Sequence, residues 1–526
     1  MNLTRRSMLT AGLGLAQLAL LDRFTRTKSA KAAPMGDGPT KLLTIYLQGG
    51  VRQQYIWWPN SDADVDRAVP PQWDHVGEPA CFSAKHLREL GPSNGPFPAL
   101  RMPTFCDPEN PGKRGAGLSP LGHTWRHFRL HENTSVLHGI DQGTNAHGSG
   151  YVASMCGLAG GTYRAPALQS VIANHFYERF RDTRPLPCVA IKSFGMPNPA
   201  GLPARSAPIL VPTANAIKPS LSADPASNPW WKGHAARVEQ PALGLDGAAV
   251  GGNLRLTDLE GAVLETTRGL HHKSTAGTDA ILEQLYGGYV GVSKVLARDV
   301  ADILAKTKGA EKLDGLSYLD GYTYSTFDFH FGANLGVKGM DGPIDMALRV
   351  LKSDLATSVH LALDEVYYDT HNGAYGHKFN AAVLRGQFDV LARLLGEMKS
   401  TPAPGRPGKT LLDDTLVLII SEFGRTWAAG PSQASLDGWQ LGDDHHPFTS
   451  VTFVGGGIEG NRQIGKFILP DARGTDVQVI EESGETTKRP PRAADVIATA
   501  CRIFGLNHED FFIPGGYGEV TGFRRT

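Results

Sequence analysis

The chain of 526 residues has little cysteine and no excess of charge of either sign. Its cysteines are odd in number and none forms a C-x-x-C pair, so neither a disulfide framework nor a thiolate zinc site is indicated. Cys81 and Cys106 could still pair across a loop. The 52 basic residues balance the 52 acidic residues, and no long run of one sign occurs. This balance argues against nucleic-acid binding.

No stretch of the sequence has the length and apolarity of a membrane span. The apolar run at 8–21 is shorter than the roughly 20 residues that a spanning helix needs. It contains glycine and follows the pair Arg5 and Arg6, a pattern that resembles a twin-arginine export signal. An uncleaved anchor is the alternative. We expect residues 1–33 to be a signal peptide that exports the folded chain to the periplasm or the medium, leaving no membrane span.

Glycine and proline are abundant but unevenly placed. Two ranges at about 59–120 and 197–251 are rich in both and have weak periodicity, which predicts loop insertions around a site. The range 254–315 instead carries helix-period patches and predicts a helical layer. Because no internal repeat occurs, we interpret residues 40–526 as a single domain with insertions.

Several apolar segments run directly into polar residues. The run at 416–420 predicts a strand buried on both faces, yet it continues into Ser421, Glu422 and Arg425. Other segments likewise join a strand pattern to glycine with aspartate or histidine, at 134–150, 358–377 and 442–460, and the strand pattern at 41–52 ends on Gly49 and Gly50, where backbone can approach a ligand closely. Ligands of open α/β sheets bind at the carboxyl ends of the strands. These segments therefore predict one shared site.

The segments between these strands predict helices. In the range before the strand at 416–420, Phe388, Leu391, Leu395 and Met398 lie three or four residues apart and form one apolar stripe. A strand, a helix and a second strand in this order favour a parallel crossover. A further helix is predicted near the C-terminus at 492–506. The fold class is therefore α/β, with an open, mostly parallel sheet and helices on both faces.

Five short motifs carry a family resemblance: SEFGRT at 421–426, DTH at 369–371, GDDHHP at 442–447, GG at 49–50 and ADVIATACRIFGL at 494–506. Together with the leader, they resemble a bacterial exported family of unknown function, marked by the SEFGR motif, that looks like a branch of the alkaline phosphatase and sulfatase superfamily. The resemblance covers about 40–520 and implies an alkaline-phosphatase-like fold. It also implies one or two metal ions at the strand ends and hydrolysis of phosphate or sulfate esters.

The resemblance implies one metal site in this chain. Asp369 and His371 resemble the first carboxylate and imidazole pair of the superfamily, and His445, preceded by Asp444, resembles its distant histidine. A solvated turn and a surface histidine pair are the alternatives. Carboxylate and imidazole ligands suit Zn²⁺ or Mn²⁺ better than Ca²⁺ or Mg²⁺. We therefore expect one divalent metal ion.

The ligands of a second ion are missing from the expected positions. Glu422 and Phe423 stand where the superfamily has an Asp-His pair, and Val51 and Arg52 stand where an aspartate is expected after the glycine pair. Less charge would then be neutralised on an ester during hydrolysis.

The resemblance places His147 where the superfamily has its nucleophile, at a helix start. Histidine can form a phosphoryl intermediate or act as a general base, so His147 is the catalytic candidate. Its alternative role is hydrogen bonding at the helix start, and Thr144 and Ser149 are alternative nucleophiles.

Two further residues of the SEFGR motif are candidates for the catalytic site. Arg425, or Arg52, could neutralise an anionic group. Glu422 could take part in catalysis, or it could form a salt bridge with Arg425 three residues later. Trp57 and Trp58, beside the glycine pair, favour core or lid packing over a platform for a sugar.

Three functions are consistent with these residues. The first is a metal-dependent hydrolase of small anionic phosphate or sulfate esters. The second is a binding protein on a decayed hydrolase scaffold that recognises an anionic glycan or a protein partner. The third is an accessory protein for surface assembly or export that keeps the fold only as structure.

Overall fold

The computed structural model describes residues 38–51, 56–60, 82–93, 95–105, 117–118, 120–158, 165–191, 201–203, 206–211, 341–363, 368–369, 373–425, 444–468, 473–507 and 517–525. Several sequence predictions concern residues outside these ranges: the signal peptide, the helical layer at 254–315, His371, Arg52, and the pair Cys81 and Cys106. Most of the insertion predicted at 197–251 also lies outside them.

An eight-stranded sheet forms the centre of the described chain, in the order β13-β5-β12-β9-β1-β8-β6-β7. β12 is antiparallel to both of its neighbours, and the other pairings in this sheet are parallel. The strands are β1 Lys41–Leu47, β5 Thr134–Asp141, β6 Cys188–Ile191, β7 Ile209–Val211, β8 Ser358–Leu363, β9 Thr415–Ile420, β12 Phe448–Gly455 and β13 Arg462–Ile464. The prediction of a mostly parallel α/β sheet is confirmed.

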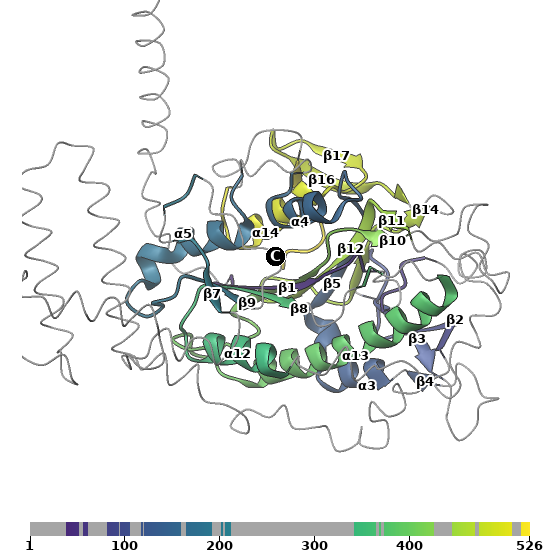
Figure 1. The fold of residues 1–526 in the computed structure, drawn as a ribbon, viewed down its shortest axis with the longest axis horizontal. Coiled ribbons are helices and arrows are strands. Elements are labelled where there is room, and N and C mark those ends of the chain that lie inside the picture. Colours follow the sequence, from purple (N-terminus) through teal and green to yellow (C-terminus); the bar gives the residue numbers. More distant parts are fainter. Residues whose placement is uncertain are drawn as a thin grey trace, which may run out of the picture.

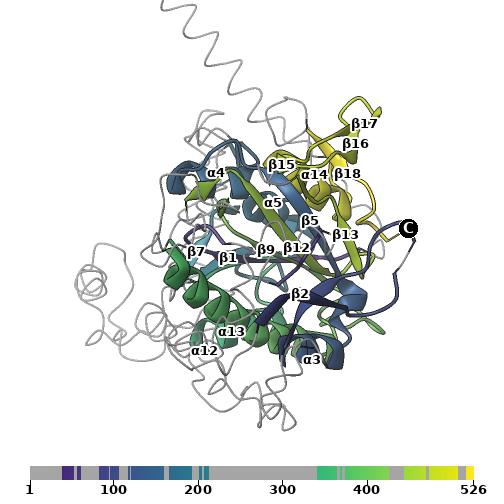
Figure 2. The same cartoon turned by 90° about the vertical axis from the view of Figure 1, so that its right-hand side faces the viewer.

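Helices cover both faces of this sheet (Figures 1 and 2). One face carries α3 Pro120–His127, η3 Leu130–Asn133, α12 Asp341–Lys352 and α13 Gly373–Ser400. The other face carries α4 His147–Cys156, α5 Leu168–Phe180 and α14 Ala493–Ile503. The three layers place the central strands β1, β8 and β9 in the interior, with both faces covered.

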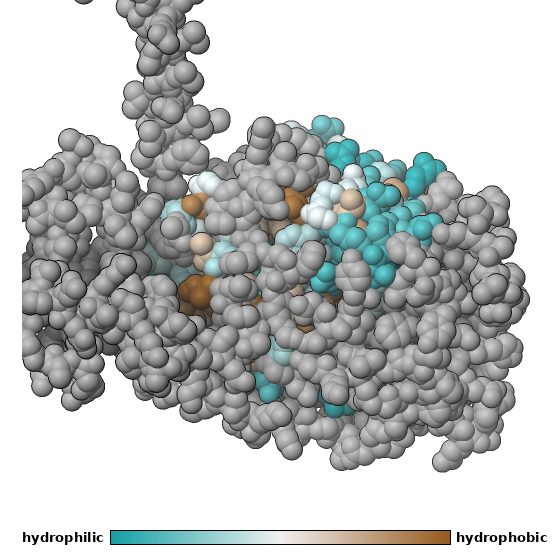
Figure 3. Space-filling model, viewed as in Figure 1, coloured by the Kyte–Doolittle hydropathy of each residue, from teal (hydrophilic) through white to brown (hydrophobic). Residues whose placement is uncertain are grey.

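Smaller sheets surround the centre. They comprise β2 Phe82–Glu89, β3 Arg101–Phe105 and β4 Gly117–Leu118; β10 Gly424–Arg425 and β11 His445–His446; β14 Phe467–Ile468 and β15 Arg473–Gly474; and β16 Val477–Glu481, β17 Thr486–Arg489 and β18 Gly518–Val520. The first of these lies within the range predicted as an insertion at about 59–120. The described surface over β16 and β17 is hydrophilic (Figure 3).

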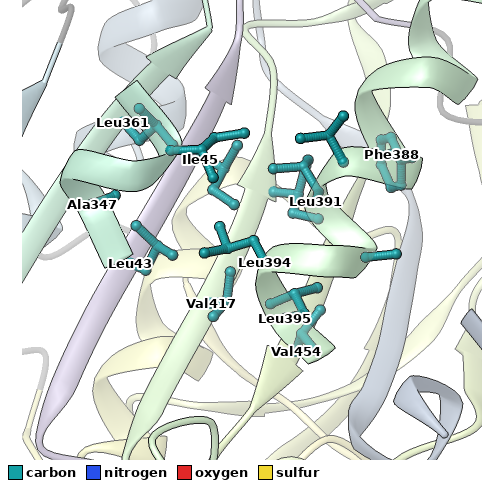
Figure 4. Packing of buried hydrophobic residues seen from close by; sticks show 14 of the residues in the cluster. Leu43, Ile45, Ala347, Leu361, Phe388, Leu391, Leu394, Leu395, Val417 and Val454 are labelled. Carbon is teal, nitrogen blue, oxygen red and sulfur yellow. The ribbon is translucent and has the colours of Figure 1, made fainter. Parts of the chain in front are cut away.

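The two faces of β1 serve two hydrophobic clusters. Leu43 and Ile45 pack with α13 residues, including Leu391 and Leu394, in the cluster shown in Figure 4. The alternate residues, including Tyr46, face the cluster on the side of α4, α5 and α14. This burial on both faces explains why the strands appear as unbroken apolar runs.

The helical stripes predicted from spacing are buried. Phe388, Leu391, Leu395 and Met398 are fully buried on α13. The apolar side chains of α14 belong to the hydrophobic cluster on the sheet face that α4 and α5 also cover. The helix predictions in these two ranges are therefore confirmed.

The tryptophans beside the first strand are core residues. Trp57 is fully buried, donates its indole N–H to the hydroxyl of Thr452 at 3.0 Å, and packs edge-on against Trp125. Trp58 is also buried. The interpretation as packing residues is confirmed.

The amino ends of β1 and β9 hold a buried ion network. Lys41 and Arg406 both bind the carboxylate of Asp414, at 2.7 and 2.8 Å. Arg184 and Lys41 both bind Asp354. Every one of these charges has a partner of opposite sign, so we assign the network a structural role at the end of the sheet remote from the polar strand ends.

Among the described residues, no helix combines the length and apolarity that a membrane span requires. Cys156, Cys188 and Cys501 are buried and free.

Candidate metal centre

The carboxyl ends of the central strands meet the start of α4. Asp369 follows β8, Glu422 follows β9, and His147 is the first residue of α4. His445 reaches the same place from β11, where it pairs with Arg425 of β10. Among the described residues, His147, Asp369 and His445 form one group that could hold a metal ion, because their ligand atoms all lie within 4.8 Å of one another.

Asp369 is the centre of this group. His147 Nε2 lies 3.0 Å from Asp369 Oδ2, and His445 Nε2 lies 2.8 Å from Asp369 Oδ1. The two imidazole rings are nearly perpendicular, with centroids 4.5 Å apart. All three side chains are only partly exposed. The arrangement directs two nitrogens and one carboxylate toward a common point.

The other nitrogen of each imidazole faces an acceptor. His147 Nδ1 lies 2.8 Å from Glu422 Oε1, and His445 Nδ1 lies 2.8 Å from the carbonyl oxygen of Asn145. Since a carbonyl or carboxylate oxygen accepts, we assign a proton to each Nδ1. Each Nε2 then either carries a second proton toward Asp369 or offers its lone pair to a cation. Histidine ligands of metals commonly have their second nitrogen held in this way.

The local charges set the protonation of two members of the group. The hydrogen bond to Glu422 raises the pKa of His147 above its ordinary value, partial burial opposes this, and Asp369 adds to the rise. Partial burial raises the pKa of Asp369, but hydrogen bonds from Arg425 and His445 outweigh it and hold that pKa well below its usual range. Asp369 is therefore a carboxylate at neutral pH, the form that binds metals.

Arg425 is buried behind Asp369. Its Nη2 donates to Asp369 Oδ1 at 2.7 Å and to the Tyr368 carbonyl oxygen at 3.1 Å. It also donates to the carbonyl oxygens of Gly49 and Gly50. These bonds join the ends of β1 and β8, so the guanidinium fixes the position of Asp369.

Glu422 is buried on the opposite side of the group. The polar partners of its carboxylate are Tyr46, Gly49, Ser421 and His147. The sequence suggested, as an alternative, a salt bridge between Glu422 and Arg425. That prediction is wrong. The chain bends at Glu422 and then forms the short strand β10, and the two side chains diverge, one toward His147 of α4 and the other toward Asp369.

Phe423 closes the space beside the group. Its ring is fully buried and lies 4.4 Å from the ring of His445 and 4.9 Å from that of His147, measured between centroids. Gly50 has a positive φ, and a Cβ there would overlap the Phe423 ring. Within the described residues, no second group of metal-ligand side chains is present.

The residues predicted from sequence have different places in this geometry. Asp369 and His445, predicted as ligands, lie together. His147, predicted as the catalytic residue, joins them through its Nε2 atom. Asp444 is exposed and lies outside the three-residue group. His371 lies outside the described residues.

The two hydroxyl groups weighed as nucleophiles belong to the turn that opens α4. Thr144 Oγ1 and Ser149 Oγ lie 2.6 Å apart and share a hydrogen bond. Tyr46 was missed by sequence reasoning. The signal for it is weak, because Tyr46 is one of two hydroxyl-bearing side chains in β1, with Thr44.

Comparison with known proteins gives one family match. A family model described as "Protein of unknown function (DUF1501)" matches residues 326–521. The matched range includes Asp369, Glu422, Arg425 and His445, whereas His147 precedes it. No curated protein matches the chain. The match supports similarity to an uncharacterised family.

Proposed function

We propose that this protein binds one divalent metal ion through His147, Asp369 and His445. The observation that carries the proposal is the convergence of two Nε2 atoms on the carboxylate of Asp369 while both Nδ1 atoms are held by acceptors. Two imidazoles and one carboxylate suit Zn²⁺ or Mn²⁺, because Ca²⁺ and Mg²⁺ prefer oxygen ligands. Three protein ligands also leave room for a further ligand.

We also propose that the protein is an exported relative of phosphate and sulfate ester hydrolases, with an alkaline-phosphatase-like fold. The SEFGR and DTH motifs and the twin-arginine leader support this proposal. The mostly parallel sheet, with its polar site at the carboxyl ends of the strands, also supports it. The substrate class is a small anionic ester, whose oxygens a metal ion at this site would polarise.

The surrounding residues would position the ligands during such a reaction. Arg425 holds Asp369, and Glu422 holds His147. Thr144 and Ser149 are the hydroxyl groups beside His147 that could attack an ester, since His147 itself is directed at Asp369. With one metal ion, less transition-state charge is neutralised than with two, so we expect slow turnover.

A second candidate is a binding or surface-assembly accessory protein that does not turn over its ligand. Two observations favour it. Donors of the buried Arg425 are directed at backbone carbonyls and at Asp369. Phe423 fills the space beside the histidines with an apolar ring. Such a protein would hold an anionic ester or glycan at the metal ion.

The experiment that separates the candidates measures hydrolysis and binding on the same metal-loaded protein. Zinc-loaded and manganese-loaded samples are given a panel of aryl phosphate and aryl sulfate esters, with His445→Ala as the metal-site variant. Slow turnover that disappears in the variant and after chelation supports the hydrolase. Retained metal without turnover, combined with calorimetric binding of inorganic phosphate or sulfate, favours the binding protein. Equal turnover after chelation contradicts both.

A further inference from the structure

The Glu422 carboxylate is a buried junction between the first strand and the start of α4. Tyr46 donates its hydroxyl proton to Glu422 Oε2 at 2.8 Å, and the backbone N–H of Gly49 donates to Oε1 at 2.6 Å. His147 Nδ1 lies 2.8 Å from the same Oε1 atom. Tyr46 is fully buried and Glu422 is 1% exposed. The carboxylate is therefore held by donors of the protein, away from bulk water.

The start of α4 lies close to the backbone of Glu422. A Cβ at Gly150 would lie 2.8 Å from the carbonyl oxygen of Glu422, so only glycine lets the helix come this near. The two nitrogens of the His147 imidazole contact Glu422 and Asp369, so these carboxylates hold the ring in its orientation.

Ser421 is a weaker anchor for Glu422 than Tyr46 is. The Ser421 hydroxyl lies 3.0 Å from Glu422 Oε2 but 2.7 Å from the carbonyl oxygen of Leu47. A hydroxyl has one proton, both oxygens can only accept, and the Leu47 carbonyl oxygen makes the shorter contact. Tyr46 is then the side chain that donates to Oε2.

We propose that Tyr46 is a positioning residue for the metal centre, acting through Glu422 on His147. By fixing Glu422, it keeps the proton of His147 on Nδ1 and leaves Nε2 directed at the metal position. The proposal rests on the proposed metal site for its effect on affinity. Its effect on the imidazole of His147 is independent of any metal.

Loss of the Tyr46 hydroxyl removes a donor from a buried carboxylate without changing the ring. The Glu422 carboxylate can then rotate or accept a hydrogen bond from another donor. Its contact with His147 Nδ1 weakens as a result. Changes to residues that hold a metal-ligating histidine typically lower metal affinity 10- to 100-fold. We expect a loss of this size for Tyr46→Phe.

The chain offers a matched control in Tyr368→Phe. Tyr368 is also fully buried, and it directly precedes Asp369, but its hydroxyl donates to Gln387 of α13 at 2.6 Å. The two variants therefore remove the same group from equally buried rings on opposite faces of the sheet. Only one of them alters the surroundings of Glu422.

The first measurement is zinc affinity by competition with a chromophoric chelator. The second is the ¹⁵N spectrum of labelled histidine in chelator-treated protein at a pH where the imidazoles are neutral, with the His147 signals assigned from a His147→Gln variant. We expect Tyr46→Phe to weaken zinc binding 10- to 100-fold and to mix the two tautomers of His147, whereas Tyr368→Phe changes neither.

Equal losses of affinity in the two variants would overturn the proposal, and so would an unchanged Nδ1-protonated imidazole in Tyr46→Phe. If wild-type protein binds no zinc, the proposed function fails, but the tautomer measurement still decides the role of Tyr46. If Tyr46→Phe does not fold, Glu422→Gln takes its place, because it keeps the shape and removes the charge that holds Nδ1–H.

Discussion

Arg425 Nη2 lies 2.7 Å from Asp369 Oδ1, the same oxygen that His445 Nε2 approaches to 2.8 Å. The guanidinium is 3% exposed and also binds the carbonyl oxygen of Tyr368. An arginine in this position supports Asp369 when no metal is present. It also sets the direction in which the second carboxylate oxygen faces His147.

This relationship predicts how Arg425→Gln behaves. Removal of Arg425 leaves the carboxylate of Asp369 without its guanidinium partner. Breaking a fully buried pair costs about 3 kcal/mol, and the partial exposure of Asp369 reduces this cost. Thermal unfolding of metal-free protein should show the loss. Zinc should then raise the unfolding temperature of the variant more than that of the wild type, because the metal restores a positive charge beside Asp369.

The control for this experiment is Arg181→Gln. Arg181 pairs with Glu178 three residues earlier, at 3.2 Å, where both side chains are about half exposed. A pair of this kind contributes about 1 kcal/mol or less. An Arg425 variant that is no less stable than the Arg181 variant would show that Arg425 does not support Asp369.

Gly49→Ala should damage the site more than it damages the rest of the fold. Gly49 has a φ of +110°, and a Cβ there would overlap the backbone nitrogen of Tyr368, next to Asp369. Gly405 also has a positive φ, but a Cβ there would meet nothing within 4 Å. Gly405→Ala should therefore cost only the 1–2 kcal/mol typical of a left-handed residue. Zinc titration and chemical denaturation of both variants check the difference, and equal zinc affinity would argue against the close approach.

The buried histidines predict that stability falls in mild acid. Burial lowers the pKa of His138 to about 3 and that of His360 to about 4. In the unfolded chain both pKa values lie near 6.5. Below that pH the unfolded state therefore binds protons that the folded state does not bind. The stabilisation from these neutral histidines is complete above about pH 6.5 and declines as the pH falls toward their folded values.

Each buried histidine should lower the free energy of unfolding by about 1.4 kcal/mol for each pH unit of acidification, in the range where only the unfolded state is protonated. Between pH 6 and 5, the free energy of unfolding of His360→Leu should therefore depend less steeply on pH than that of the wild type. The difference in slope corresponds to one proton. Denaturant melts at several pH values measure this slope. His147, whose pKa is raised, contributes in the opposite direction and only above pH 6.5. Identical slopes for variant and wild type would contradict the buried, neutral state of His360.

The export proposal predicts a defect when Arg5 and Arg6 are both changed to lysine. The twin-arginine signal is read through this pair, so the precursor should accumulate in the cytoplasm although its charge is unchanged. Arg23→Lys with Arg26→Lys, later in the same leader, is the matched control. Fractionation and immunoblotting measure the distribution, and normal delivery of the first double variant would refute the assignment of the leader.

The fold was largely predictable because its strands and helices have strong patterns. Strands buried on both faces appear as apolar runs such as 416–420, and the α13 stripe repeats at spacings of three and four. The antiparallel direction of β12 could not be predicted, because an apolar strand carries no mark of direction. The strands β10 and β11 have two residues each, too few for any periodic pattern.

The site was only partly predictable for a similar reason. Asp369 and His445 could be found because they stand at strand ends in motifs. The place of His147 Nε2 in the three-residue group depends on which nitrogen Glu422 holds, a property of side-chain geometry. The spacing of Glu422 and Arg425 suggested a pair, but the segment is not helical, and residues three apart face each other on a helix.

The most direct test of the metal centre is elemental analysis of purified wild-type protein and of His147→Ala, His445→Ala and His446→Ala after loading with zinc or manganese. His446 is the neighbour of His445 on β11 but lies outside the three-residue group. The site predicts about one ion per chain in wild type and in the His446 variant, and strong loss in the other two. An absence of metal from loaded wild type, or a full equivalent retained by His147→Ala, would contradict it.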